Sequence, residues 1–207
     1  DEAVEIGMKF KESCDRNQIS YVFKASFDKA NRTSFDSYRG PGLTKGLEML
    51  REIKDILKVP ILTDIHETFQ TNEAAEVCDL IQALAKTGKP INIKKPQFVS
   101  PEQIKFIVQK FSKFGCEDVV ICERGSMYGY NQQIVDIIGL EIIKEQTNKP
   151  VCVDSTHSLQ FRNEGSSASS GRRKYALNLA KAVTATSIDA LFVEAHQNPD
   201  FAKCDGP

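Results

Sequence analysis

The amino-acid sequence predicts an α/β protein and, within that class, a (β/α)8 TIM barrel. Short β-rich runs alternate with amphipathic helical stretches along the chain, which is the pattern of a parallel sheet. Most of these runs begin with apolar residues and end with a polar one, as a barrel requires, because the loops that follow its strands build the active face. The sequence has no glycine-rich phosphate turn of the kind that open doubly wound sheets usually carry.

The strands are expected where β-branched and aromatic residues cluster between turn signals. Their predicted ranges are 20–26, 59–65, 78–82, 90–95, 118–124, 150–156 and 189–196. Six of the seven run from apolar into charged residues, among them the strands that lead into Lys24, Asp64 and Asp154. A single charged strand end marks only the point where a strand reaches solvent, but the repetition favours one shared functional edge.

Helical periodicity marks an opening stretch and three later ranges, 43–57, 101–114 and 173–184. In the opening stretch the apolar residues that share related faces are Val4, Met8 and Phe10. The range 101–114 begins with an N-cap serine, a first-turn proline and a capping-box glutamine, which are Ser100, Pro101 and Gln103.

The count of elements departs from a whole barrel. Seven strands are predicted instead of eight, and no closing helix follows 204–207. The strand that ends at Gln82 is separated by only eight residues from the one that begins near Ile91, whereas a parallel crossover needs about a dozen or more. We therefore expect a single, incomplete barrel domain over 1–207, with a segment missing after Gln82, where a complete barrel ends its strand 4.

Composition limits the classes of partner. The 27 basic and 28 acidic side chains give a net charge of −1, so no global field attracts nucleic acid or an anionic membrane. No apolar run is long enough to cross a bilayer. The six cysteines form no CxxC pair and several lie in apolar runs, which predicts reduced thiols and a cytoplasmic location.

The first candidate site follows the first predicted strand. Cationic, hydroxyl and amide side chains gather there, namely Lys24, Ser26, Lys29, Asn31, Arg32 and Thr33. Cations beside hydroxyl groups and backbone amides are what a phosphate cradle needs, because they supply charge together with hydrogen-bond donors. A solvated basic loop is the alternative.

The second candidate site combines Lys94 and Arg124, which follow two further strands. If both strand ends face the same volume, these cations hold a second dianion. A lysine in that position is alternatively a Schiff-base nucleophile, provided that desolvation keeps its amine neutral. The number of nearby cations favours anion binding.

The third candidate site comprises His157, Glu194 and Asp205, and His66 and His196 also lie near strand ends. Such a set either binds a divalent metal or transfers protons, with His157 as general acid or base. For His66 and His196 a structural role is an equal alternative.

The glycine- and serine-rich stretch 164–173 is either a mobile lid or a plain linker.

Five runs of this sequence closely resemble 3-deoxy-D-manno-octulosonate 8-phosphate synthases. They are FKASFDKANR (23–32), SYRGPG (37–42), NIKKPQF (92–98), DSTHSLQ (154–160) and KCDGP (203–207). The resemblance covers essentially the whole chain. It implies condensation of phosphoenolpyruvate with arabinose 5-phosphate, in the pathway to Kdo and lipopolysaccharide, by a homotetramer of TIM barrels. It also implies that the first strand, an arginine-bearing segment after Gln82 and the C-terminal helix are missing here.

The resemblance assigns a role to each candidate residue. The residues that would surround phosphoenolpyruvate are Lys24, Ser26, Lys29, Lys94, Gln97 and Arg124, with Lys94 and Arg124 on its phosphate. Asn31, Arg32 and Thr33 would bind the sugar phosphate, and Asp64, Gln82 and Gln160 would line the same cavity. His157, Glu194 and Asp205 would be catalytic, together with Lys24 and Lys29.

Metal use depends on a first strand that this chain lacks. In the family, metal-dependent members add a cysteine on that strand to the positions of His157, Glu194 and Asp205, and metal-independent members have asparagine there. The runs 170–173 and 203–207 resemble metal-independent members. We therefore expect no metal cofactor, with a divalent metal as the alternative.

The rival functions are the related 3-deoxy-7-phosphoheptulonate synthase, which uses erythrose 4-phosphate, and a non-catalytic barrel that binds phosphosugars.

Overall fold

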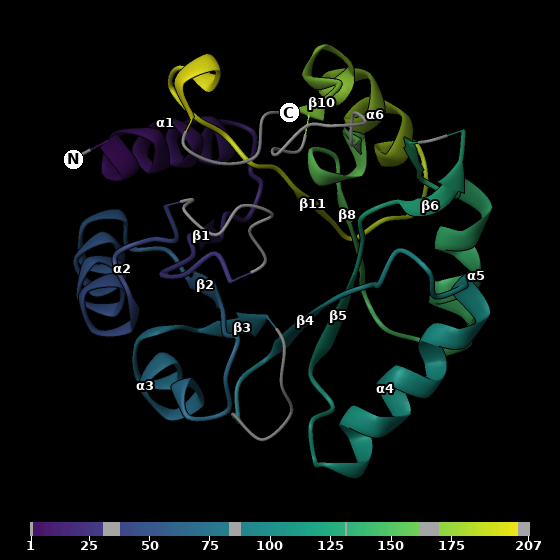
Figure 1. Cartoon of the computed structure of the whole chain (residues 1–207), viewed down its shortest axis with the longest axis horizontal. Helices are drawn as coiled ribbons and strands as arrows, with labels where there is room; N and C mark the ends of the chain where they lie inside the picture. Colours follow the sequence, from purple (N-terminus) through teal and green to yellow (C-terminus); the bar gives the residue numbers. More distant parts are fainter. Residues whose placement is uncertain (1, 31–37, 83–87, 131, 162–169, 203–207) are drawn as a thin grey trace. The chain divides into compact units, whose positions relative to one another are not determined.

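A computed structural model describes residues 2–30, 38–82, 88–130, 132–161 and 170–202 (Figure 1). The chain divides into two compact units, residues 1–91 and 92–207, and each is described by itself. The expectation of one domain over 1–207 concerns both units together and stays a prediction.

The first unit alternates helices and parallel strands. Its elements are α1 (Glu2–Arg16), β1 (Phe23–Lys24), α2 (Leu43–Leu57), β2 (Ile61–Asp64), α3 (Gln70–Val77) and β3 (Leu80–Gln82). Strand β2 pairs in parallel with β1 on one side and with β3 on the other. Ile81 of β3 pairs with Ile91, the first residue of β4 (Ile91–Lys94).

The core of the first unit lies between α2 and the strands. Apolar residues recur every three or four positions along α2, and those that are buried are Leu47, Leu50, Ile53 and Leu57. Helix α1 packs closely on this layer at Gly7, where a Cβ atom would come 2.5 Å from Leu57 Cδ1. The predicted opening helix is confirmed as α1, and Met8 on it is 47% exposed. Gly7, which has no side chain to separate the elements, is buried instead.

The second unit continues the same pattern. Its strand order is β4, β5 (Val119–Glu123), β8 (Val151–Asp154) and β11 (Ala190–Phe192), and β8 is parallel to both β5 and β11. Its helices are α4 (Ile104–Lys113), α5 (Ile137–Thr147) and α6 (Ala176–Thr184), with 3₁₀ turns η1 (Pro101–Gln103), η2 (His157–Leu159), η3 (Arg173–Tyr175) and η4 (Pro199–Phe201). Helices α4 and α5 lie side by side along the same side of β5 (Figure 1).

Two antiparallel hairpins are inserted after strands of the second unit. One joins β6 (Ser126–Gly129) to β7 (Gln132–Ile134), and the other joins β9 (Gln160–Phe161) to β10 (Ser170–Gly171). Within the stretch 164–173, for which a mobile lid or a plain linker is predicted, Ser170 and Gly171 pair with β9. Residues 162–169 lie outside the described part of the chain.

The predicted α/β class is confirmed, and a strand forms within each of the seven predicted ranges. The helix at 43–57 has the predicted ends. The capping box at Ser100 is wrong: the Ser100 side chain makes no cap bond, a 3₁₀ turn follows it, and α4 begins only at Ile104.

The described cysteines are all free thiols, and Cys78, Cys122 and Cys152 are buried. Burial raises the pKa of Cys78 to about 12, so this thiol stays protonated at neutral pH.

Among the helices that the structure describes, none is both long and apolar enough to cross a membrane.

An aspartate just before a strand secures the start of the neighbouring strand in each unit. In the first unit Asp79 Oδ2 accepts a hydrogen bond from Ile61 N at 2.9 Å, and its Oδ1 lies 2.9 Å from Lys54 Nζ. In the second unit Asp189 accepts from Val151 N at 2.8 Å and pairs with Lys144. Each aspartate thus connects the strand that follows it, the start of the neighbouring strand and the helix that carries the lysine.

We predict that Asp79→Asn lowers the free energy of unfolding by about 1 kcal/mol at neutral pH, because charge-assisted hydrogen bonds are lost at a partly exposed site. Burial raises the pKa of Asp79, but the Ile61 N–H and Lys54 outweigh it, so the pKa is lowered overall. The contribution is therefore complete above the ordinary carboxyl pKa near about 4 and is lost as the pH falls through the lower folded-state value.

Urea denaturation of both proteins from neutral to acid pH measures this difference, which should shrink in acid. Asp55→Asn is the matched control, because Asp55 is exposed and lies 3.8 Å from Lys58. A difference for Asp79→Asn that is independent of pH would contradict the proposed role of its charge.

Candidate active site

The carboxylate of Asp154, at the end of β8, is the centre of the polar cluster in the second unit. Its Oδ1 accepts hydrogen bonds from Thr156 N at 3.1 Å, Thr156 Oγ1 at 2.9 Å and His157 N at 2.8 Å. Its Oδ2 lies 2.7 Å from both Lys94 Nζ and His157 Nδ1. Burial raises the pKa of Asp154, but His157 and Lys94 outweigh it and hold the pKa far below its usual range. The buried carboxylate is therefore ionised and fully hydrogen-bonded.

His157 is held between two carboxylates. Its Nδ1 faces Asp154, and its Nε2 lies 3.0 Å from Glu194 Oε2. Burial lowers the pKa of His157, but the hydrogen bonds to Asp154 and Glu194 outweigh that effect and raise it overall. This arrangement favours an imidazolium that donates from both nitrogens, which suits a general acid.

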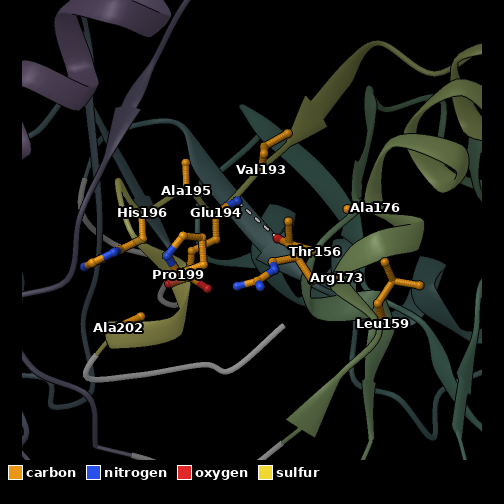
Figure 2. Close-up of a pocket in the computed structure, with 10 residues that line it drawn as sticks. All are labelled: Thr156, Leu159, Arg173, Ala176, Val193, Glu194, Ala195, His196, Pro199 and Ala202. Carbon is orange, nitrogen blue, oxygen red and sulfur yellow. Dashed lines mark hydrogen bonds between the residues drawn. The ribbon is translucent and has the colours of Figure 1, made fainter.

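The backbone of Glu194 is held by Thr156, which follows β8. Its backbone N donates to Thr156 Oγ1 at 3.1 Å, the bond drawn in Figure 2. Because the Thr156 hydroxyl also donates to Asp154, one threonine connects the segment after β11 to the end of β8. The same threonine side chain thus holds the carboxylate of Asp154 and the backbone of Glu194.

Lys94, at the end of β4, lies against Asp154 and 4.1 Å from the centroid of the Phe192 ring. The carboxylate and the ring face both favour a charged ammonium group. A Schiff-base nucleophile needs a neutral amine, so the contacts of Lys94 favour the anion-binding alternative.

Arg124 follows β5 and points to two glutamines of the hairpins. Its Nη1 donates to Gln133 Oε1 at 3.1 Å, and its Nη2 donates to Gln160 Oε1 at 2.9 Å. Both of these acceptors are neutral amide oxygens, so the two bonds orient the guanidinium. The structure thus brings the predicted residue Gln160 onto Arg124, and it adds Gln133, which the sequence did not single out.

A buried ion pair supports the loops that carry Lys94 and Arg124. Lys95 Nζ lies 3.3 Å from Glu123 Oε2, and neither side chain is exposed by more than 3%. Lys95 also donates to Val99 O at 3.0 Å, while Glu123 Oε1 accepts from Gly125 N at 2.5 Å. Because a strand alternates its faces, Lys95 points away from the side of Lys94 and holds the following loop. Sequence reasoning did not separate the two lysines.

The first unit holds a cluster around Asp64, at the end of β2. Lys24 Nζ lies 3.2 Å from Asp64 Oδ1 and 2.6 Å from Ser26 Oγ. Burial raises the pKa of Asp64, but Lys24, the Ser26 hydrogen bond, His66 and Lys29 outweigh it and lower the pKa overall. His66 Nε2 is 2.9 Å from Asp28 O and 3.4 Å from Asp64 Oδ2, so contacts within this unit account for His66. Lys24, Ser26, Asp64 and Lys29 therefore form one electrostatic cluster.

The remaining predicted residues have different settings. Gln82, at the end of β3, has a buried Oε1 without a hydrogen-bond partner. Gln97 is half-buried, and its carbonyl oxygen accepts from Met127 N at 3.2 Å. His196 Nδ1 accepts from Asn198 N at 3.0 Å. The predicted residues Asn31, Arg32, Thr33 and Asp205 lie outside the part of the chain that the structure describes.

A cavity of about 330 Å³ opens beside Glu194 (Figure 2). Most of its wall is apolar, and its polar lining residues are Thr156, Arg173, Glu194 and His196. Arg173 pairs with Asp200 of η4 at 2.8 Å. The cavity therefore places open space next to the carboxylate that faces His157.

The described residues do not fit a metal ion. Both ring nitrogens of His157 are engaged by carboxylates, which leaves no lone pair to donate to a metal when the ring is protonated. Within the described ranges, no group of three or more His, Cys, Asp and Glu side chains has a metal-binding arrangement.

The sequence that forms these strands and strand ends matches a known protein family. The family model described as the DAHP synthetase I family matches residues 1–207. This chain belongs to the DAHP synthetase I family. The membership agrees with the predicted α/β barrel class.

The named relatives within the DAHP synthetase I family are similar over the whole chain. A "2-dehydro-3-deoxyphosphooctonate aldolase" of Aliivibrio fischeri is 50% identical, and the alignment covers 100% of this chain and 78% of that protein. Proteins of the same name from Vibrio cholerae and Vibrio vulnificus are 48% and 47% identical with the same coverage. The alignments span 221 positions against 207 residues here, so these relatives contain residues that this chain lacks.

We predict that Asp154→Asn lowers the free energy of unfolding by about 3 kcal/mol, because Lys94 and His157 would remain buried without their shared carboxylate. Asp189→Asn is the matched control, because Asp189 precedes β11, accepts from Val151 N at the start of β8 and has a side chain that is 42% exposed, and it should cost about 1 kcal/mol. Chemical denaturation at neutral pH measures both. Equal losses would contradict the central role of Asp154.

Proposed function

We propose that this protein condenses phosphoenolpyruvate with D-arabinose 5-phosphate and water to give 3-deoxy-D-manno-octulosonate 8-phosphate and inorganic phosphate. The observation that carries the proposal is 50% identity over the whole chain to a protein named 2-dehydro-3-deoxyphosphooctonate aldolase. The cluster of Lys94, Asp154, His157 and Glu194 supports it, because it combines a cation for an anionic substrate with acid and base groups.

The reaction brings two phosphorylated substrates together, so their negative charges must be offset before the carbon atoms can approach. Lys94 and Arg124 supply positive charge at two strand ends of the second unit, and Lys24 and Lys29 lie in the cluster of the first. We assign Lys94 and Arg124 to the phosphate of phosphoenolpyruvate, with Ser26 and Gln97 as further contacts. Asn31, Arg32 and Thr33 are assigned to the sugar and its phosphate.

The bond-forming step joins the methylene carbon of phosphoenolpyruvate to the aldehyde carbon of the sugar. Negative charge develops on the aldehyde oxygen, and a protonated His157 stabilises it and donates the proton. Water then adds to the cationic carbon that remains, and inorganic phosphate leaves. Glu194, which lies 3.0 Å from His157 Nε2, accepts the proton of that water or passes it to the ring, with Asp205 as the second proposed base.

Asp64, Gln82 and Gln160 are assigned to the wall of the substrate site. Gln160 already contacts Arg124, and the buried, unpartnered Oε1 of Gln82 is an acceptor that a hydroxyl group of the substrate would satisfy. A homotetrameric assembly and a cytoplasmic location complete the proposal. We expect neither nucleic acid nor a membrane as a partner.

The related synthase that uses erythrose 4-phosphate is the second candidate function, because the family's description names DAHP synthetase. The ANR run at 30–32 and the CDGP run at 204–207 favour arabinose 5-phosphate. A non-catalytic barrel would be expected to lose part of its acid, base or cationic set, whereas every predicted residue is retained in the sequence.

Steady-state assays with each sugar decide between these candidates. We predict that release of inorganic phosphate from phosphoenolpyruvate depends on arabinose 5-phosphate, with kcat/KM about 100-fold or more above that for erythrose 4-phosphate. Lys94→Ala should lower kcat/KM by a factor equivalent to about 2–5 kcal/mol, whereas Lys144→Ala, which removes an ion-paired lysine outside the site, should not. A preference for erythrose 4-phosphate, or no turnover with either sugar, would reject the proposal.

We also predict turnover without a metal. Exhaustive dialysis against a chelator should leave kcat unchanged, because both nitrogens of His157 are already engaged by Asp154 and Glu194. Metal analysis of the dialysed protein is the control, because it shows whether the chelator has removed the metal. Activity that is lost on dialysis and restored by manganese or zinc would show instead that His157, Glu194 and Asp205 bind a metal.

A further inference from the structure

Two arginines of the second unit converge on one glutamine. Arg124 Nη1 donates to the side chain of Gln133 at 3.1 Å, and Arg172 Nη2 donates to the backbone oxygen of the same residue at 3.3 Å. Arg124 follows β5, whereas Arg172 follows β10, so two separate loops bring the guanidinium groups to Gln133. Like charges are brought together in this way where an anion separates them.

The backbone fixes this convergence. Gly171 pairs with Gln160 in the β9–β10 hairpin, and Arg172 N then donates to Leu159 O at 3.1 Å. Gln160 is also the second acceptor of Arg124, so Arg172 begins directly beside a residue that Arg124 contacts. Gly125 has a φ of +88°, and a Cβ atom there would come 2.9 Å from Gln133 Cβ. Glycine therefore allows Gln133 to approach the backbone next to Arg124.

The guanidinium of Arg172 can donate a further hydrogen bond. Its Nε is buried without a hydrogen-bond partner, and among the described residues no acidic side chain pairs with it. The adjacent Arg173 differs, because it pairs with Asp200 at 2.8 Å. A buried donor without an acceptor costs free energy that an incoming anion would recover. The unpaired Nε of Arg172 is thus an observation that points to a ligand.

We propose that Arg172 is the second guanidinium of a phosphate-binding site that it shares with Arg124. A phosphate group suits this pair, because its three terminal oxygens can accept from two planar guanidinium forks at once. Gln133 and Gln160 hold the forks with neutral oxygens and do not compete with the ligand for charge. The choice of ligand rests on the proposed function: Arg124 is assigned there to the phosphate of phosphoenolpyruvate, and Arg172 binds the same group.

The test compares three variants with the wild-type protein. Arg172→Gln removes the charge and the fork, Arg172→Lys keeps the charge only, and Lys174→Ala removes a neighbouring charge that lies 4.9 Å from the Tyr175 ring. Isothermal titration with inorganic phosphate and, separately, with phosphoenolpyruvate measures affinity without requiring turnover. We expect both Kd values to rise by about tenfold or more in Arg172→Gln and Arg172→Lys, and to stay unchanged in Lys174→Ala.

Thermal unfolding separates ligand binding from a structural role. Without ligand, Arg172→Gln should keep a Tm close to that of the wild type, because it removes a buried Nε that has no partner and one long hydrogen bond, from Nη2 to Gln133 O at 3.3 Å. Inorganic phosphate should raise the Tm of the wild type and of Lys174→Ala, and this shift should be smaller in Arg172→Gln. A lower Tm without ligand together with an unchanged Kd would show a structural arginine and overturn the proposal.

Kinetics identify which phosphate is bound. The proposal expects Arg172→Lys to raise KM for phosphoenolpyruvate while KM for arabinose 5-phosphate stays within about twofold. A rise confined to the sugar would place the pair of arginines on the sugar phosphate and overturn the assignment. If the wild type binds inorganic phosphate through Arg172 but turns over neither sugar, the proposed function fails and the phosphate site stands.

Discussion

The buried carboxylate of Asp154 is the interaction on which the candidate site of the second unit depends. It faces an ammonium group, an imidazole ring and three further donors, each at hydrogen-bond distance. Lys94 comes from β4 and His157 from the segment after β8, so the carboxylate orients groups from two parts of the unit. A buried anion with these partners stays ionised, and its hydrogen bond and charge help to raise the pKa of His157. Removal of the carboxylate would leave cations facing each other in a site of low dielectric.

Acidic residues have different roles where the parallel strands begin and where they end. Where strands begin, Asp79 and Asp189 accept backbone hydrogen bonds and pair with helix lysines, which stabilises the fold. Where strands end, Asp64 and Asp154 pair with lysines that are candidates for substrate binding. The same residue type thus serves stability at one edge and the candidate site at the other. In barrels of this class the active site lies at the ends of the strands.

Several parts of the fold and site were predictable from the sequence because they depend on local patterns. Each strand range was found from β-branched runs, and α2 was found with both of its ends, because its apolar residues follow one helical stripe. The capping box at Ser100 was wrong, since the Ser100 side chain makes no cap bond and a 3₁₀ turn separates it from α4. The hairpins were not found, because their strands have only two to four residues and show no clear alternation of apolar and polar side chains.

For the candidate site, the sequence by itself determined the types of residue and the strand ends that carry them, since both follow from the chain order. Lys94, Arg124, His157 and Glu194 were found in this way. Only the tertiary structure decided which groups meet: that Asp154 joins Lys94 to His157, that Lys95 pairs with Glu123 instead of facing the site, and that Arg172 turns to Gln133 while Arg173 turns to Asp200. The reason is physical. Adjacent residues on a strand or turn point to different faces, and burial and charge then depend on neighbours that are distant in the sequence.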